Sequence, residues 1–278
     1  MPLSPTETSK ILEEINHRPK KKLGQNFLVD GNIVHKSLTM ANLPTGIPVV
    51  EIGPGLGTLT KQLLANDHNV FAIEIDDGLF INLEKSFSGD IENSQLFLSK
   101  GDAVKSPLAN LPEDINEFAV VANLPYAISS PWMESLLHTQ RIPLRMVIML
   151  QKEAVGRMNA KHGTKEYNAL SIFLKAAFSH IQTHPVSRQC FFPIPGIDSV
   201  LVQMDRLQKP FLFSQEDRSL IRRIFTQRRK QIGSLIKKEE PKVKERINRW
   251  LESNELARNL RPEQIEAKHW QLLAESES

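Results

Sequence analysis

The most informative feature of this 278-residue sequence is a regular alternation of short apolar and longer amphipathic segments between residues 48 and 151. The amphipathic segments carry apolar residues at helical spacing, as Leu59, Leu63 and Leu64 do. Near-continuous apolar strands separated by helices are typical of a parallel sheet covered on both faces. We therefore predict an α/β fold with a Rossmann-like, doubly wound, mostly parallel sheet. The expected strands are Val49–Gly53, Asn69–Ile75, Leu96–Lys100, Phe118–Asn123 and Leu144–Leu150.

The pattern changes after residue 151. Lys152–Met158 and Ala169–Ser179 have helical spacing, and Val186–Phe192 and Ser199–Leu207 are strand-like segments joined by a proline-rich turn. Antiparallel pairing of these two strands would end the sheet in a terminal hairpin. From about Phe213 the pattern is wholly helical, which predicts a smaller all-α C-terminal domain.

Three regions follow from this reading: a basic extension over residues 1–22, the α/β domain over residues 23–208 and a helical domain over residues 209–278. Residues 206–250 hold 14 Lys and Arg against 5 Asp and Glu, whereas the rest of the chain is net acidic. This distribution favours a polyanionic partner for the helical domain. The alternative is a solvated helical face with no partner.

Simple counts exclude several classes of protein. The one cysteine, Cys190, cannot form an internal disulfide or a thiolate zinc site, and the sequence carries no metal-site signature. The longest apolar runs, such as Met146–Leu150, are far shorter than the roughly 18 residues that cross a bilayer. Residues 1–22 lack the apolar core of a secretory signal. We expect a cytoplasmic protein with no bound metal and no membrane contact.

The first expected strand runs into the glycine-rich turn Gly53-Pro-Gly-Leu-Gly57, which a helix follows. Gly53 and Gly55 let the backbone approach a ligand that a Cβ would exclude. At the end of the second strand, Glu74 can accept hydrogen bonds from both hydroxyls of a ribose. After the third strand, Asp102 can accept one from an adenine amino group. The order of these groups predicts a nucleoside-containing cofactor; the alternative is that both carboxylates only cap loops.

The loop also indicates which nucleoside is bound. Pro54 lies inside it and Glu51 precedes it, where a phosphate-binding loop usually opens directly onto a helix. A negative charge at Glu51 disfavours a pyrophosphate and favours the cationic end of S-adenosyl-L-methionine.

The segment after the fourth expected strand, Asn123-Leu124-Pro125-Tyr126, contains groups suited to a planar amine. Proline fixes the turn and offers no competing N–H. The Asn123 side-chain oxygen can accept from an exocyclic amine, and the Tyr126 ring can stack on a base. Acceptors around the amine of adenine favour the pyramidal geometry in which its lone pair can attack a methyl sulfonium, so positioning and electrostatics suffice for catalysis.

With these residues in order, the chain resembles the ribosomal RNA adenine N6-dimethyltransferase family, and its small-subunit members most. The resemblance spans about residues 20–275. Besides the segments above, it rests on Lys22-Leu-Gly-Gln-Asn-Phe-Leu28, Leu150-Gln-Lys-Glu153, Phe192-Pro-Ile-Pro-Gly-Ile-Asp-Ser199, Gln227-Arg-Arg-Lys230 and Arg261-Pro-Glu-Gln264. Two positions depart from the family pattern: Ala127 stands where Asn is usual, and Gly196 replaces a frequent Lys, which puts RNA affinity in question.

The resemblance implies a role for each matching residue. The cofactor site would be lined by Asn26, Leu28, Gly53, Gly55, Glu74, Asp102 and Asn123. The target adenine would be held by Asn123, Leu124, Pro125 and Tyr126, and Phe192 would supply a second aromatic face; core packing is the alternative for Phe192. RNA would be bound by Lys20, Lys21, Lys22, Arg222, Arg223, Arg228, Arg229 and Lys230, the last five expected mostly along one helix.

The resemblance also implies the substrate, namely two adjacent adenosines in a hairpin near the 3′ end of small-subunit (16S) rRNA. Each would be methylated twice, by a monomeric enzyme acting on a late 30S assembly intermediate. Three alternatives are weighed against it. They are a large-subunit (23S) rRNA adenine methyltransferase that confers macrolide resistance, a non-catalytic ribosome assembly factor of the same fold, and a Rossmann oxidoreductase.

Overall fold

The computed structural model describes residues 3–276, apart from the side chains of His180 and Ile181. Its chain contacts divide it into two compact units. The first comprises Met1–Val155 and His180–Arg206, and the second comprises Gly156–Ser179 and Leu207–Ser278. The expected boundary after residue 208 lies close to the observed one after Arg206. Residues 156–179, which we expected in the α/β domain, group with the second unit because helix α8 (Ala169–Ala177) packs against helices of the C-terminal region.

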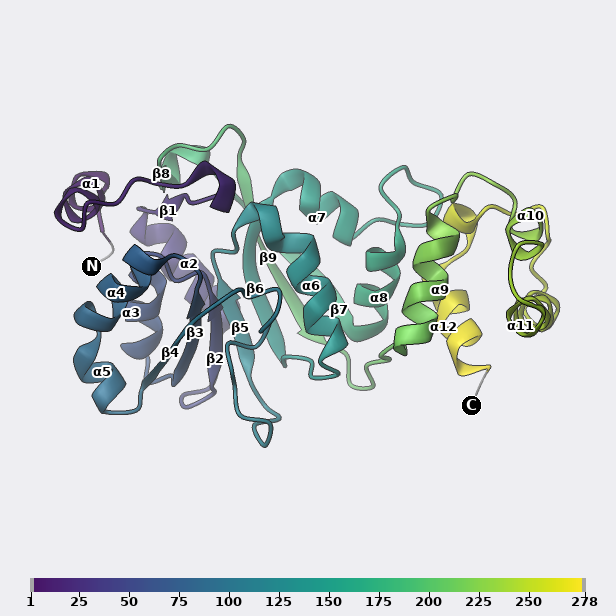
Figure 1. Cartoon of the computed structure of the whole chain (residues 1–278), viewed down its shortest axis with the longest axis horizontal. Coiled ribbons are helices and arrows are strands. Elements are labelled where there is room, and N and C mark those ends of the chain that lie inside the picture. The colour runs from purple at the N-terminus through teal and green to yellow at the C-terminus, as the bar shows by residue number, and fades with distance from the viewer. Residues whose placement is uncertain (1–2, 277–278) are drawn as a thin grey trace. The chain divides into compact units, whose positions relative to one another are not determined.

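The first unit is built on a seven-stranded sheet of order β4-β3-β2-β5-β6-β9-β7, with helices on its faces (Figure 1). The neighbours from β4 to β6 pair in parallel, and β9 joins β6 in the antiparallel sense. This arrangement confirms the predicted mostly parallel sheet with antiparallel strands at one end. The strands are β2 (Val49–Ile52), β3 (Val70–Glu74), β4 (Leu96–Lys100), β5 (Ala119–Ala122), β6 (Arg145–Gln151), β7 (Phe178–Val186) and β9 (Ser199–Arg206).

The central strands form where the apolar runs were recognised because they are covered on both faces. Every residue of β2, β3 and β5 is buried, and so are the five central residues of β6. The helices of this unit are α1 (Pro5–Glu14), α2 (Gly31–Ala41), α3 (Thr58–Leu64), α4 (Asp77–Ser86), α5 (Ser88–Glu92), α6 (Ser129–His138) and α7 (Lys152–Met158), the last of which ends in the second unit.

The expected strand at Val186–Phe192 is wrong. The strand beside β9 is β7, which ends at Val186. Phe191–Phe192 forms a separate short strand, β8, which pairs antiparallel with β1 (Phe27–Leu28) in a two-stranded sheet. β7 is an edge strand with several exposed polar residues, so it lacks the apolar run of a central strand.

The N-terminal extension contains a helix that we did not expect. Ser4 caps α1 by accepting from the Glu7 backbone, and the Glu7 side chain accepts from the Ser4 backbone in return. Leu12 of α1 is buried in a small apolar cluster with Phe27, Leu56 and Leu79. The segment is therefore packed onto the sheet domain instead of projecting from it.

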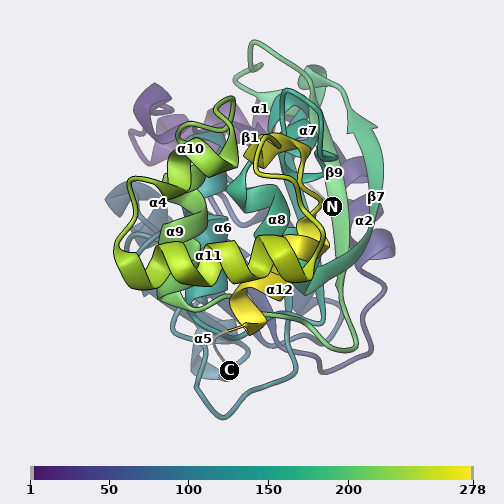
Figure 2. The ribbon, with the colours of Figure 1, turned by 90° about the vertical axis from the view of Figure 1, so that its right-hand side faces the viewer.

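The second unit is helical (Figure 2) and has its own core, in which the ring of Trp270 contacts those of Phe225 and Trp250 in tilted arrangements. Asp217 and Arg246 form a buried ion pair between two of its helices. Together with α8, its helices are α9 (Gln215–Phe225), α10 (Ile232–Ile236), α11 (Pro241–Ser253) and α12 (Ala267–Glu275). The prediction of a smaller all-α C-terminal region is confirmed.

Candidate functional site

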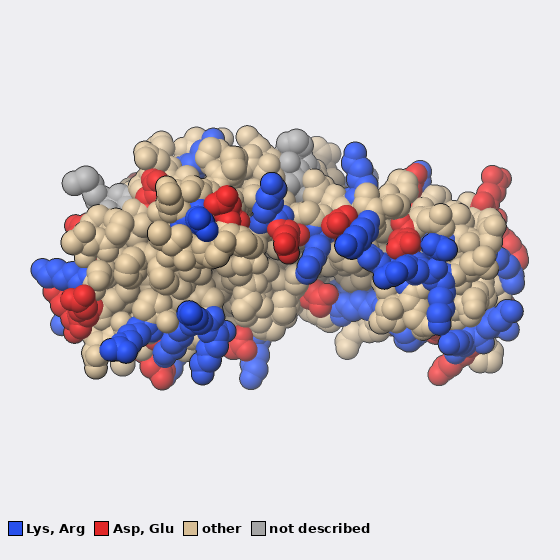
Figure 3. Space-filling model, turned by 90° about the horizontal axis from the view of Figure 1, so that it is seen from above, with Lys and Arg blue, Asp and Glu red and all other residues tan. Residues whose placement is uncertain are grey.

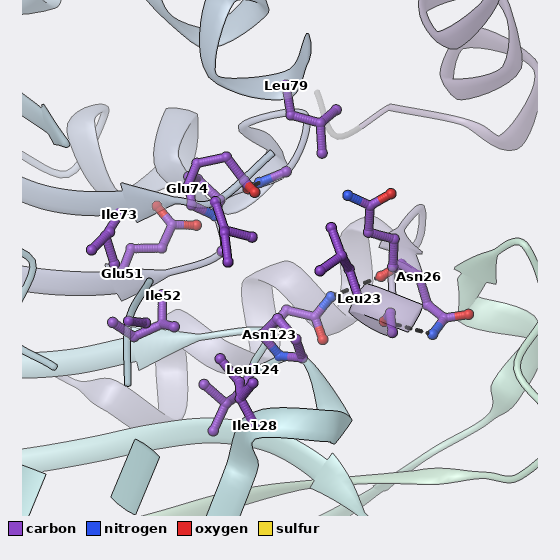
Figure 4. A pocket seen from close by; sticks show the side chains of 18 of the residues that line it. Leu23, Asn26, Glu51, Ile52, Ile73, Glu74, Leu79, Asn123, Leu124 and Ile128 are labelled. Atoms are coloured by element: carbon purple, nitrogen blue, oxygen red, sulfur yellow. Dashed lines mark hydrogen bonds between the residues drawn. The ribbon is translucent and has the colours of Figure 1, made fainter. Parts of the chain in front are cut away.

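A cavity in the first unit lies at the carboxyl ends of β2, β3 and β5 (Figure 4). Five segments that are distant in sequence meet there because the parallel strands end at the same edge of the sheet. The segments contributing lining residues are 22–28, 51–59, 73–75, 101–103 and 123–128. All cofactor-site candidates lie in these segments, and so do four of the five predicted catalytic residues; Phe192 does not.

The glycine loop has no room for side chains on its cavity side. Gly53 and Gly55 have φ angles of +65° and +63°. A Cβ on Gly53 would lie 3.2 Å from Pro125 Cγ, and one on Gly55 would lie 3.2 Å from Phe27 Cδ1. The loop is thus in contact with both the N-terminal motif and the segment after β5, and glycine is required by φ and by these close approaches.

Glu74 fixes this loop from the end of β3. Its carboxylate accepts from the backbone N–H of Gly55 at 3.1 Å and from that of Asp76 at 2.9 Å. The residue is 4% exposed, and burial raises the pKa of its carboxyl group. The Glu74 carboxylate therefore lies in the cavity wall and is attached to the glycine loop through Gly55. After the neighbouring strand β4, Asp102 also lines the cavity and accepts from the backbone N–H of Val104, so that it caps its own turn.

Glu51 differs from our expectation. It is 2% exposed, and its carboxyl accepts a 2.7 Å hydrogen bond from the hydroxyl of Thr60. Burial raises its pKa to about 8, with a further contribution from Glu74. Without a cationic ligand the pKa therefore favours the uncharged carboxyl at neutral pH, and a charged Glu51 facing the cofactor stays a prediction. In its uncharged form, Glu51 contributes a neutral hydrogen-bonding group to the cavity.

The segment after β5 is held by contacts at both of its ends. The Asn123 amide nitrogen donates to the backbone carbonyl of Asn26 at 3.1 Å, which directs the acceptor Oδ1 away from Asn26 (Figure 4). Pro125 packs on the glycine loop, and the hydroxyl of Tyr126 is hydrogen-bonded to that of Ser199. The Leu124 side chain is fully buried, so that this residue shapes the segment from the core.

The N-terminal motif forms the opposite wall. The Asn26 side chain donates to the carbonyl of Gly24 at 3.0 Å, which stabilises the turn at the start of this wall. Leu28 is 6% exposed and extends into the main apolar core. We did not predict the contacts that anchor this wall: His17 and Lys20 both reach Asp76, with Lys20 Nζ 2.5 Å from its carboxylate. Burial opposes ionisation of Asp76, but Lys20 and nearby N–H groups lower its pKa overall.

Phe192 lies outside the cavity lining. It is half-buried against the cluster that contains Phe27 and Leu56, and its backbone pairs with that of Phe27. The Phe-x-Pro-x-Pro spacing is met by Phe191, which is 2% exposed in the main core. Phe27 and Tyr126 are aromatic residues of the described cavity lining, and a stacking role for Phe192 stays a prediction.

The predicted RNA-binding cations fall into two groups. Several have internal partners: Lys20 binds Asp76, Arg223 binds Glu239 through two hydrogen bonds, and Arg222 stacks on Phe173. Arg228 donates to the carbonyls of Lys165 and Tyr167, each at 2.5 Å. The expectation that the cluster runs along one helix is also wrong in part, since α9 ends at Phe225 and residues 228–230 lie in turns.

The other predicted cations are exposed. Lys21 and Lys22 lie in the short helical turn Lys21–Leu23 at the start of the N-terminal motif, and Lys22 is part of the cavity lining. Arg229 and Lys230 are exposed in the second unit, where Lys230 Nζ donates to the side-chain oxygen of Gln227 at 2.8 Å. Figure 3 shows Lys and Arg side chains gathered over one face of this unit, with few acidic side chains between them.

Two further expectations concern absent features. Within residues 3–276, no helix has the length and apolar character needed to cross a membrane. Among the described side chains, His, Cys, Asp and Glu form no group of three or more that could hold a metal ion.

Comparisons with known proteins agree with this geometry. The family model described as "Ribosomal RNA adenine dimethylase" matches residues 16–271. The "Ribosomal RNA small subunit methyltransferase A" of Opitutus terrae is 44% identical over 100% of both chains. The protein of the same name from Anoxybacillus flavithermus is 39% identical over 87% of this chain and 84% of its own.

Solved structures give the same result for the fold. A dimethyladenosine transferase from Plasmodium falciparum aligns with a TM-score of 0.71 at 25% identity, over 89% of this chain and 95% of that one. The 23S rRNA methyltransferase ErmE aligns with a TM-score of 0.63 at 22% identity, over 90% and 99% of the respective chains. The second likeness concerns the fold alone.

Proposed function

Because the chain belongs to the ribosomal RNA adenine dimethylase family, it is an rRNA adenine methyltransferase, and we propose that its substrate is small-subunit rRNA. The modified bases would be two adjacent adenosines in a hairpin near the 3′ end, each methylated twice at N6. We further propose that the enzyme acts as a monomer in the cytoplasm, on a late 30S assembly intermediate. The full-length identity to proteins named small subunit methyltransferase A supports this choice.

The cavity residues fit S-adenosyl-L-methionine. Glu74 offers a carboxylate where the hydroxyls of a ribose would lie, and the glycine loop that it holds lines the same cavity through Gly53 and Gly55. Asp102 offers an acceptor for the adenine amine on the other side. Asn26 and Leu28 would complete the site from the N-terminal motif. When bound, this cofactor supplies an electrophilic methyl group on a sulfonium.

One contact carries the catalytic proposal: the hydrogen bond from Asn123 to the carbonyl of Asn26. It uses the donor end of the amide and so presents Oδ1 as an acceptor for a substrate amine. That acceptor would orient N6 of adenine, and Pro125, fixed against Gly53, would hold the adjoining turn. The ring of Tyr126, positioned through Ser199, would stack on the base. A base taken out of its stack can reach such a cavity.

No strong general base is required by this arrangement. After each methyl transfer the amine nitrogen would carry a positive charge and lose one proton to water, so that orientation of the lone pair is the main task of the protein. The cations that could bind phosphates are the exposed Lys21, Lys22, Arg229 and Lys230.

The direct test is to incubate the purified protein and labelled cofactor with small and large ribosomal subunits that lack the modification, side by side. Mass spectrometry then maps the methylated nucleotides. We expect N6,N6-dimethyladenine at two adjacent positions in small-subunit rRNA. Label confined to large-subunit rRNA would contradict the proposed substrate, and binding of cofactor and RNA without methylation would contradict the proposed activity.

A further inference from the structure

The loop between β8 and β9 carries two exposed isoleucines that the proposed reaction does not use. Ile194 is 62% exposed and Ile197 is 42% exposed, although both are large apolar side chains. Between them, Pro195 is buried and anchors the middle of the loop. The two side chains therefore lie on either side of a fixed point and face solvent together.

Both ends of this loop are attached to the walls of the cavity. On one side, Phe192 pairs with Phe27, which lines the cavity from the N-terminal motif. On the other side, Ser199 is hydrogen-bonded to Tyr126, which lines it from the segment after β5. The loop that carries Ile194 and Ile197 therefore joins the two cavity walls through the residues at its ends.

The charges around the loop distinguish between possible partners. At its base, Asp198 Oδ1 accepts from the backbone N–H of Arg188 at 2.9 Å, so that an exposed acidic residue and an exposed basic residue meet at the end of the loop that follows Ile197. The exposed Lys22 lines the same cavity. Exposed apolar side chains in a loop attached to a cavity that Lys22 lines match an RNA strand with its bases splayed apart, because the bases present apolar faces while the phosphates carry the charge.

We propose that Ile194 and Ile197 form an apolar wedge that packs against the base next to the target adenine and holds the RNA loop unstacked. Apolar side chains that enter a base step separate the bases in this way. This inference rests on the proposed function, because it assumes that adenine in RNA is the substrate. The proposed function concerns the target adenine alone. The wedge adds a contact to the base next to it, outside the cavity.

The glycine in this loop provides a complementary variant. A Cβ on Gly196 would meet no atom within 4 Å, and the φ of this residue lies outside the left-handed region. Gly196→Lys therefore adds a cation beside Ile197 without strain. If the loop faces RNA, this variant binds RNA more tightly and steepens the dependence of log K on log salt by roughly 1.

The experiment uses an RNA hairpin with 2-aminopurine next to the target adenine, and the full chain loaded with S-adenosylhomocysteine. Wild-type protein is expected to raise the 2-aminopurine fluorescence on binding, because the base loses its stacking neighbour. Ile194→Ser with Ile197→Ser should reduce this rise and weaken binding roughly 5- to 30-fold, while the affinity for S-adenosylhomocysteine stays unchanged. Ile81→Ser is the matched control, since Ile81 is 63% exposed on α4.

Three outcomes would overturn the wedge: unchanged fluorescence and affinity in the double variant, an equal loss in Ile81→Ser, or a loss that occurs with whole small subunits but not with the hairpin. A loss seen only with whole small subunits would indicate that the loop contacts a ribosomal protein instead of the RNA hairpin. Failure of the proposed function is separate from all three, because it would show as an absence of methylated adenine with the wild-type protein on small subunits, whereas the fluorescence measurement requires no methyl transfer.

Discussion

The side-chain amide of Asn123 and the backbone carbonyl of Asn26 are 97 residues apart in sequence and form a hydrogen bond of 3.1 Å across the cavity. The donor lies in the segment proposed to hold adenine, and the acceptor lies in the segment proposed to bind the cofactor. Ordering of the N-terminal motif and orientation of the Asn123 amide are therefore coupled. A change in either segment alters the position of the other.

Asn123→Ala is expected to lower kcat by at least about 100-fold, because it removes the group that orients the amine. RNA affinity should change little, since most of the binding free energy comes from contacts to the phosphates. Single-turnover methylation and RNA titration measure the two effects. Asn116→Ala, at an exposed position, serves as the control. Near-normal turnover in Asn123→Ala would contradict the orienting role.

Glu74→Gln is expected to weaken binding of S-adenosylhomocysteine by about 10-fold or more. The carboxylate accepts from two backbone N–H groups, and an amide in its place would turn a donor toward one of them. Hydrogen bonds to charged groups are worth about 1.5–3 kcal/mol, which sets the expected size of the loss. Calorimetric titration gives the dissociation constant, and the exposed Glu84→Gln is the control. Equal affinities in the two variants would place the ribose elsewhere.

Glu51→Gln tests the buried carboxyl through the pH dependence of unfolding. The pKa of Glu51 is about 8 in the folded protein against 4.5 for the unperturbed group, so the folded state binds more protons between these values. The contribution of Glu51 to the free energy of unfolding is therefore fully present below pH 4.5 and is lost as the pH rises toward 8. The stability of the Gln variant relative to wild type should therefore increase from pH 5 to pH 8 and then level off. A difference independent of pH in urea unfolding would show that Glu51 is already ionised when buried.

Arg228→Ala and Arg229→Ala should affect different properties, although the residues are adjacent: the first should lower stability and the second should weaken RNA binding. Arg228 donates to two backbone carbonyls, so its loss is expected to lower the free energy of unfolding by about 1–3 kcal/mol. Arg229 is exposed, and its loss should reduce the salt slope of RNA binding by about 1 while leaving stability unchanged. Denaturant unfolding and RNA titrations at several salt concentrations separate the two. An unchanged slope in Arg229→Ala would mean that this residue does not contact a phosphate.

The central sheet could be predicted because each parallel strand is buried on both faces and leaves an uninterrupted apolar run. The edge strand Phe178–Val186 could not, since its exposed Ser179, Gln182 and Thr183 hide that signal. The helix over Pro5–Glu14 did have a recognisable sign, the capping box of Ser4 and Glu7, but the lysines after it suggested a basic extension. Its burial depends on a partner, Leu79, that lies far away in sequence.

The sequence predicted which residues lie around the cavity, but it did not predict their ionisation or their charged partners. Motif order placed Gly53, Glu74 and Asn123 around one cavity, because the ends of parallel strands converge. The ionisation of Glu51 depends on its complete burial beside Thr60, which motif spacing does not encode. Likewise, the cation count alone could not separate Arg228, which binds carbonyls of a distant loop, from Arg229 at the surface.

The two-stranded sheet formed by Phe27–Leu28 and Phe191–Phe192 joins residues from opposite ends of the first unit. Its Phe27↔Phe192 register connects the segment that would bind the cofactor to the loop that carries Ile194 and Ile197. Chimeric enzymes made with relatives would therefore need to exchange both segments together. A hybrid that takes only one of them would join two aromatic partners that had not evolved side by side.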